Sequence, residues 1–87
     1  MKFLLGQTVI TRGANDELDQ SDVLMALQRH TSGDWGDLGD EDKQANEDAL
    51  KTGARLFSAY HSSKGTKFWI ITEADRSATT ILLPSEY

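Results

Sequence analysis

Apolar and polar residues alternate along the last third of the chain, and this alternation predicts three adjacent β-strands at 56–61, 66–73 and 78–83. A turn that ends in Gly65 separates the first two strands, and an acidic–basic turn separates the last two. Strands joined by such short turns pair as an antiparallel meander. One more short strand is predicted at 7–11, where the β-branched Val9 and Ile10 precede Arg12.

Two helical segments are predicted between the first strand and the meander. Ser21 followed by Asp22 is typical of an N-cap with an acid in the first turn. The apolar stripe of this helix consists of Val23, Leu24 and Leu27. The residues from 15 onward favour a further helical turn, and a second helix is predicted from about 40 to 52.

The segment between the two helices, 33–38, interrupts the helical pattern with two glycines and two aspartates. We expect a loop there that carries Trp35 onto the core. The whole pattern predicts an α+β fold. It consists of a small antiparallel sheet, a three-stranded C-terminal meander with or without the N-terminal strand, packed against two or three short helices. The chain shows no linker, repeat or low-complexity tract, so we expect a single domain over 1–87.

The strand at 66–73 is apolar on both faces, because Phe68 and Ile70 alternate with Trp69 and Ile71. A strand of this kind is predicted to be central, with helices on one side of the sheet. Trp69 then lies on the other side, where partial exposure and cover by another element are the two open alternatives. The N-terminal strand, a ligand or a second copy of the chain could cover it, so a homodimer is one alternative.

Length and composition exclude several classes of protein. The 87 residues include no cysteine, which excludes disulfide frameworks and thiolate metal sites. The first residues contain too short an apolar run for a signal peptide, and no run approaches the roughly 18 apolar residues of a membrane span. We therefore expect a cytoplasmic protein that does not enter a membrane.

The net charge of −5 is distributed unevenly along the chain. Between 15 and 48 there are eleven acidic residues and two basic ones, whereas the remainder holds three acidic residues and seven basic ones. The second predicted helix contributes an acidic surface composed of Glu41, Asp42, Glu47 and Asp48. A solvated helix face is the simpler interpretation, and a surface that meets a basic partner is the alternative.

A hard metal site is conceivable where His30 and Asp34 are four residues apart and Asp37 follows. The spacing is that of neither a calcium loop nor a helical zinc pair. We therefore expect no metal and no cofactor, and we expect Asp34 and Asp37 to accept backbone hydrogen bonds within the loop.

Glu73, Asp75 and Arg76 cluster at the tip of the second predicted hairpin. Three interpretations remain open for them. The favoured one is a structural turn with an internal Asp75–Arg76 pair, and the others are a recognition surface and acid–base catalysis. An exposed hairpin tip lacks the burial that tunes a catalytic pKa.

Direct nucleic-acid binding is a further alternative that the sequence disfavours. Four aromatic residues lie on the predicted strands: Phe57, Tyr60, Phe68 and Trp69. Arg55, Lys64 and Lys67 lie near them, and stacking platforms with basic rims have this composition. However, the net charge is negative and no RNA-recognition motif is present. Conversely, acids spaced along two helices could imitate a phosphate backbone.

Two motifs, GDWGDL at 33–38 and ITEADRSATTILLPSEY at 71–87, together with Asn46 and the 55–60 segment, resemble a family of short bacterial proteins labelled "plasmid-related". The resemblance covers most of the chain, from about Gly6 to Tyr87. It leads us to expect proline where this chain has Arg12. It implies a setting, a plasmid or other mobile element, and carries over no established activity.

These observations lead to one main hypothesis and two alternatives. The main hypothesis is an accessory protein that binds a host protein rather than an enzyme. Its candidate binding residues are Asp34, Trp35, Asp37, Trp69, Glu73, Asp75 and Arg76. One alternative is an inhibitor of a host nucleic-acid-processing defence system that uses the acidic surface as a DNA mimic. The other is a small enzyme or metal-binding protein that uses His30 and Asp34, or the hairpin tip.

Overall fold

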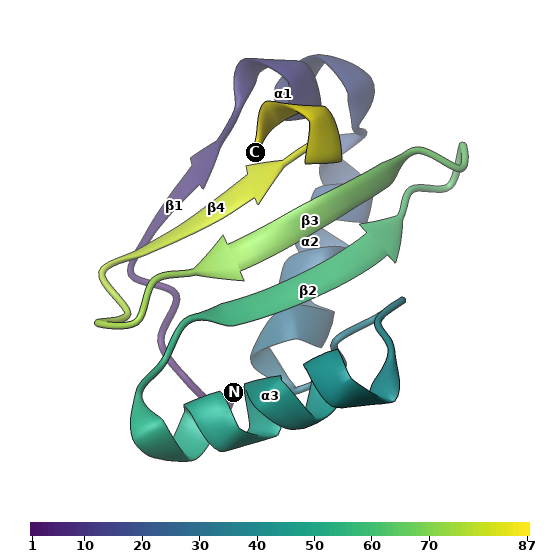
Figure 1. Ribbon diagram of the computed structural model, residues 1–87. Helices are drawn as coiled ribbons and strands as arrows, with labels where there is room; N and C mark the ends of the chain where they lie inside the picture. The colour runs from purple at the N-terminus through teal and green to yellow at the C-terminus, as the bar shows by residue number, and fades with distance from the viewer.

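Four strands, three α-helices and one short 3-10 helix make up the computed structural model, which describes residues 1–87 (Figure 1). In chain order the elements are β1 (Gln7–Ile10), α1 (Arg12–Glu17), α2 (Gln20–Thr31), α3 (Asp40–Thr52), β2 (Leu56–His61), β3 (Lys67–Thr72), β4 (Ala78–Leu82) and the 3-10 helix η1 (Pro84–Glu86). The predicted α+β fold is confirmed, and the predicted bounds of α3 and β2 match the structure.

The strands form one sheet in the order β1-β4-β3-β2. The pairs β2–β3 and β3–β4 are antiparallel, as expected for a meander. The N-terminal strand adds to the sheet beside β4 and runs parallel to it, with Ile10 opposite Ile81, so the sheet is mixed. The predicted central position of the 66–73 strand is confirmed, because β3 lies between β4 and β2.

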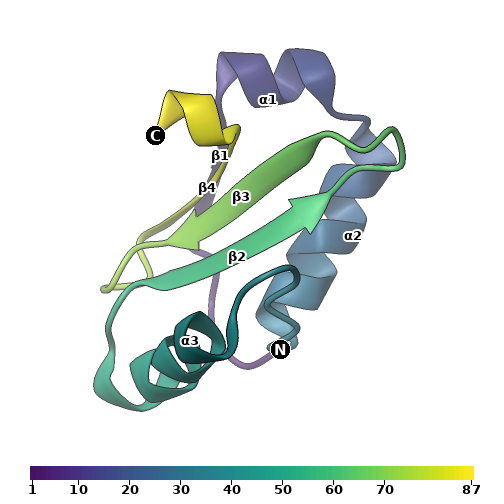
Figure 2. The same ribbon diagram turned by 45° about the vertical axis from the view of Figure 1, so that its right-hand side comes forward.

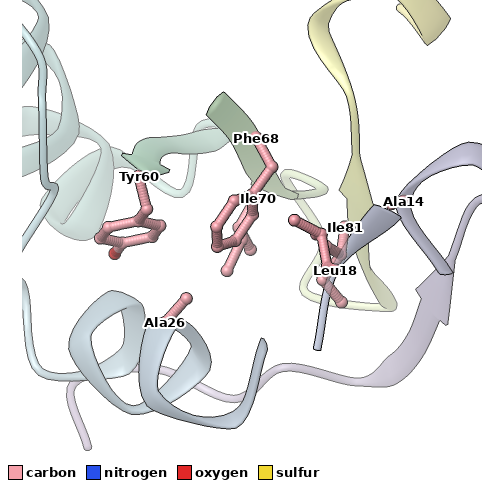
Figure 3. Packing of buried hydrophobic residues seen from close by; sticks show 7 residues of the cluster. All are labelled: Ala14, Leu18, Ala26, Tyr60, Phe68, Ile70 and Ile81. Carbon is pink, nitrogen blue, oxygen red and sulfur yellow. The ribbon is translucent and has the colours of Figure 1, made fainter. Parts of the chain in front are cut away.

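One face of the sheet, here called the helical face, is covered by α1 and α2 (Figures 1 and 2). Figure 3 shows the sheet residues of this core pointing toward the small side chain of Ala26 on α2 and toward Leu18. The cluster consists of Ala14, Leu18, Ala26, Tyr60, Phe68, Ile70 and Ile81. Because Ala26 is short, the helix axis can approach the aromatic rings of β2 and β3 closely.

The start of α2 differs from the prediction, and so does one residue of its predicted stripe: Val23 and Leu27 pack against the core, but Leu24 does not. The helix begins at Gln20 after Asp19, so Ser21 lies inside it rather than at the N-cap. Ala26 and His30, four residues apart, form the buried line, whereas Leu24 is 54% exposed. A residue four positions along a helix lies on the same face, and the interaction of His30 with the sheet therefore turns Leu24 outward.

A second, smaller core joins α3 to the sheet. Trp35, Ala49 and Leu56 are buried together, and Phe3 and Leu38 pack against them. The predicted insertion of Trp35 into the core is confirmed. The indole Nε1 donates to Glu47 Oε2 at 2.8 Å, so the polar atom of the buried ring has a partner.

Polar groups from α3 and the preceding loop satisfy the outer edge of β2. The Asn46 side chain donates to the Phe57 carbonyl at 2.6 Å and accepts from the Phe57 amide at 3.0 Å. Two residues further along, Ala59 donates to the Trp35 carbonyl and accepts from the Asp37 amide. Gly36, with φ of +77°, permits this approach, because a Cβ there would lie 2.0 Å from the Ala59 carbonyl oxygen. The edge of β2 is therefore closed to a further strand.

The Cα radius of gyration is 12.0 Å, the value expected for a globular chain of this length. The two longest helices, α2 and α3, have 12 and 13 residues. None of the helices has both the length and the apolar character needed to cross a bilayer.

We expect Asn46→Ala to lower the free energy of unfolding by about 2 kcal/mol, because it removes two hydrogen bonds and leaves the Phe57 backbone without partners. Asn46→Asp keeps the acceptor and should have a smaller effect. Urea denaturation checks this, with Gln44→Ala on the exposed side of α3 as the control. Equal stability of the Asn46→Ala variant and the control would contradict the role of Asn46.

Candidate functional site

The side of the sheet opposite α1 and α2, here called the open face, carries the candidate site. Alternation along the strands directs Phe57, Trp69 and Leu82 to this face, while their neighbours Ser58, Phe68 and Ile81 enter the core. Only η1 and the C-terminal residue fold over the open face (Figure 2). No α-helix covers this face; Leu82 is buried on it, whereas Phe57 and Trp69 stay partly exposed.

Three aromatic rings meet on the open face. The Trp69 ring lies 5.1 Å from the Phe57 ring at an interplanar angle of 89°, and 5.7 Å from the Tyr87 ring at 70°. Edge-to-face contacts of this kind stabilise the cluster beyond simple burial. Trp69 is partly buried, and Tyr87 is 69% exposed. The aromatic surface is therefore both ordered and accessible.

Arg55 connects the end of the chain to the start of β2. Its guanidinium donates to the Tyr87 hydroxyl at 2.8 Å and lies 5.8 Å from the centre of the same ring. A cavity of about 220 Å³ lies on each side of this contact. One is lined by Phe57 and Trp69, and the other is bordered by Glu73. Both cavities are shallow and open to solvent.

The carboxylate of Glu86 holds η1 in place. It accepts from the Thr11 hydroxyl at 2.5 Å and from the backbone amides of Gly13 and Leu83 at 2.9 Å each. These hydrogen bonds, the one from Thr11 first, keep the pKa of Glu86 below its ordinary value. The position of Tyr87 over the sheet therefore depends on an ionised carboxylate at the neighbouring residue.

The loop residues that the sequence analysis selected have structural partners. Trp35 is buried, and the Asp34 carboxylate forms a bidentate pair with Arg29 at 2.7 and 3.2 Å. This pairing lowers the pKa of Asp34. Asp37 is exposed, and its carboxylate lies 3.9 Å from His61 Nδ1 beside a cavity of about 350 Å³. Of these residues, Asp37 presents its side chain most freely to solvent.

The residues of the hairpin tip point in different directions. Asp75 accepts from the Ser77 amide at 3.0 Å, and hydrogen bonds from Ser77 lower the pKa of this exposed carboxyl. Arg76, with φ of +60°, turns toward the end of α3 and donates to the carbonyls of Ala49 and Ala54 at 3.1 and 2.7 Å. The expected internal Asp75–Arg76 pair is therefore wrong, because helix-terminal carbonyls hold the guanidinium instead. Glu73 stays exposed at the rim of the open face.

His30 is fully buried and does not face the Asp34 carboxylate. Its Nδ1 lies 2.5 Å from the Ser58 hydroxyl and its Nε2 lies 2.9 Å from the Thr72 hydroxyl. Both ring nitrogens are thus occupied by hydroxyl groups of the sheet. Burial, with a smaller contribution from the charge of Arg76, lowers the pKa of His30 to about 4.

The hydrogen bonds beyond His30 fix the position of its proton. The Thr79 hydroxyl donates to the Leu5 carbonyl at 2.7 Å, so it must accept the 2.7 Å bond from Thr72. Thr72 therefore donates its one hydroxyl proton to Thr79, and the Thr72 oxygen must accept a hydrogen bond from His30 Nε2. Consequently Nδ1 accepts from Ser58. The imidazole is neutral, in one tautomer, at the head of a directed chain of hydroxyls.

The acidic surface lies apart from the open face. Glu41, Asp42 and Asp48 are exposed on α3, whereas Glu47 is partly buried and accepts from Trp35. A second group of acids occupies α1 and the start of α2, which lie at the other end of the molecule from α3 (Figures 1 and 2). The acids of the helices therefore form two separate clusters. No group of three or more histidine and acidic side chains is arranged to hold a metal ion.

Three residues of the open-face site are absent from the candidate binding residues: Arg55, Phe57 and Tyr87. The sequence grouped Arg55 and Phe57 with Trp69 only in the disfavoured nucleic-acid alternative. Phe57 on β2 and Arg55, which directly precedes this strand, are two residues apart and so share a face; the hairpin register could have placed both beside Trp69. No local pattern predicts that Tyr87 returns over the sheet. Its position depends on contacts of Glu86 with residues more than seventy positions away.

The chain matches no protein-family model, no curated protein and no solved structure.

Glu86→Gln should release η1 and move Tyr87 away from Trp69, because a neutral amide accepts more weakly from Thr11 and the two amides. We expect the Trp69 emission to shift to longer wavelength and to become more sensitive to acrylamide. The buried Trp35 adds a constant background. Ser85→Ala, on the same short helix, is the matched control, and identical quenching in both variants would contradict the anchoring role.

His30 should make stability depend on pH below neutrality. Its folded pKa of about 4 lies below the ordinary 6.5, so the neutral folded form is fully favoured above pH 6.5. As the pH falls from 6.5 to 4, the unfolded chain binds a proton at His30 before the folded chain does. We therefore expect the free energy of unfolding to fall by about 3 kcal/mol. Denaturant titrations across this range measure the loss.

Two variants separate His30 from the other histidine. His61→Gln should retain the pH dependence, because His61 is exposed, whereas His30→Gln should flatten it. If the His30→Gln protein does not fold, the imidazole C–H resonances of the unmodified protein report the same pKa by NMR. A His30 titration near pH 6.5 would overturn the prediction.

Proposed function

We propose that this protein is a small binding module that acts by contact with another protein, and that the open face around Trp69 is its contact surface. The observation that carries the proposal is the ordered, accessible cluster of Phe57, Trp69 and Tyr87 with Arg55 beside it. Tryptophan, tyrosine and arginine are the residue types that contribute most to protein–protein affinity.

The shape of the surface supports a protein partner over a small substrate. The two cavities beside Arg55 hold about 220 Å³ each and are open, whereas small-molecule sites are usually larger and enclosed. Partly exposed apolar side chains surrounded by polar ones are typical of an interface core with its rim. Arg55 and Glu73 supply that polar rim here.

The candidate catalytic groups support binding rather than turnover. His30 is enclosed, and Arg76 is bound to the carbonyls at the end of α3. Asp75 is exposed, without the burial that raises a carboxyl pKa toward neutrality. For these reasons we do not assign an enzymatic role to His30 with Asp34 or to the hairpin tip.

The resemblance to plasmid-related proteins supplies the biological setting of the proposal. An accessory factor of a mobile element would meet host proteins in the cytoplasm. A second candidate function within that setting is inhibition of a nucleic-acid-processing enzyme by the acidic surface. The exposure of Glu41, Asp42 and Asp48 on one helix favours it, and the separation of the acids into two clusters limits the length of phosphate backbone that they could imitate.

Affinity capture from a bacterial lysate with matched variants tests the proposal. We expect a retained partner to be lost with Trp69→Thr and with Tyr87→Ser, since hot-spot truncations cost about 2 kcal/mol or more, roughly 30-fold in affinity. The triple variant Glu41→Gln, Asp42→Asn, Asp48→Asn should retain it. Thermal melting of each variant controls for folding.

The opposite result would indicate that the acidic surface, and not the open face, binds the partner. In that case capture would fall in the triple variant and weaken steeply with added salt, while Trp69→Thr would bind normally. A partner that both sets of variants retain equally would exclude both surfaces.

A further inference from the structure

The outer edge of β1 has none of the protection that closes the outer edge of β2. All four residues of β1 are exposed, and no element of the chain lies beyond it (Figure 1). The strand contains no charge and no proline, which are the usual features that keep an edge from pairing. In fact the chain has no charged residue between Lys2 and Arg12, although its net charge is −5.

The backbone groups of alternate residues in β1 point to opposite sides, and this alternation identifies which groups are free on the outer edge. The amides of Gln7 and Thr11 donate to Ser77 and Ile81 of the neighbouring segment. In a parallel ladder, alternate residues direct both N–H and C=O to the same side. Thr8 and Ile10 therefore direct their N–H and C=O groups outward, where the chain offers them no partner.

The two ends of β1 limit how many of these groups a further strand can pair with. Gly6 has φ of +64°, outside the extended region, so a ladder cannot continue past it. Beyond Ile10, Thr11 is the N-cap of α1. Two outward residues are thus available, Thr8 and Ile10, separated by Val9.

We propose that β1 pairs with β1 of a second copy of this chain, antiparallel, about a two-fold axis at Val9. In this register Thr8 of each copy exchanges both hydrogen bonds with Ile10 of the other, and all four free groups of each edge are satisfied. The two Val9 side chains lie directly opposite each other on the open face. The two sheets then continue as one sheet of eight strands.

The surroundings of β1 fit a second copy. Because the edge is uncharged, two copies bring no like charges into opposition along the strand. On the helical face, an apolar cavity of about 530 Å³ runs between β1 and α2, with Ile10 and Leu24 on its walls. Ile10 of the second copy would stand beside Thr8, at the open side of this cavity. Ile10 and Leu24, both exposed in the single chain, would then lie at a shared apolar surface.

A single-cysteine scan tests the register, because the chain has no cysteine of its own. Across the axis the two residues at position 9 form a non-hydrogen-bonded pair with Cα atoms about 4.5 Å apart, within the range of a disulfide. Val9→Cys should therefore cross-link on oxidation at least about tenfold faster than Gln7→Cys. Gln7 lies on the same face of the same strand but opposite Thr11 of the second copy.

Analytical ultracentrifugation of the unmodified protein should show a concentration-dependent change from 9.6 kDa to twice that mass. Thr8→Pro removes one outward N–H without touching the bonds to β4, and we expect it to weaken the dimer at least about tenfold. Thr8→Ala keeps the N–H and is the matched control, with affinity close to that of the unmodified protein. Far-UV circular dichroism verifies that both variants fold.

Three results would overturn the proposal. One is a monomer at all concentrations up to about 1 mM, a limit at which even weak interfaces associate. Another is equal cross-linking at positions 7 and 9. The third is a dimer that survives Thr8→Pro but is lost with Trp69→Thr, which would assign association to the open face. If Thr8→Pro does not fold, the cysteine scan alone tests the β1 pairing. Capture of a host partner that depends on Trp69 is a separate result, so either proposal can fail without the other.

Discussion

The buried imidazole of His30 is the constraint on which the rest of the structure depends. A polar ring enclosed in a small core costs free energy unless both nitrogens are hydrogen-bonded, and here Ser58 and Thr72 provide those bonds. The chain of hydroxyls then continues through Thr79 to the Leu5 carbonyl. A single side chain of α2 thereby connects three strands and the segment that leads into β1.

This constraint separates the two faces of the sheet. The hydroxyls of Ser58 and Thr72 point to His30, and that of Thr79 continues the chain from Thr72. The helical face therefore forms the interior, which holds these polar groups together with the apolar core. The alternate positions are left to carry Phe57 and Trp69 outward. The aromatic surface is thus a consequence of which strand positions supply the hydrogen bonds to the buried imidazole. Glu86 adds the last step, because its bonds to Thr11 and Gly13 bring Tyr87 over the sheet.

The sequence predicted the elements well because their signals are local. Alternation along 56–61 and 66–73, and the acids at the start of α3, identify strands and helix without knowledge of the tertiary structure. Leu24 was misjudged for a tertiary reason, since the polar residue His30 takes the central buried position of α2. A hydrophobic-stripe argument assigns that position to an aliphatic residue.

The candidate site was less accessible to sequence reasoning. Trp69 was recognised because its strand is apolar on both faces, but the roles of Arg55 and Tyr87 depend on contacts between distant segments. Arg76 illustrates the same limit. It neighbours Asp75 in the chain, yet its positive φ directs the guanidinium to the carbonyls at the end of α3. Neighbouring charges in a turn do not establish a pair.

The contrast between the two edges of the sheet determines how far association could extend. Asn46 and the loop around Gly36 occupy the backbone groups of β2, so each chain offers only one strand for pairing. Joining two such chains uses both available edges and leaves no template for a third. The covered edge of β2 therefore protects this small chain from open-ended polymerisation into fibres.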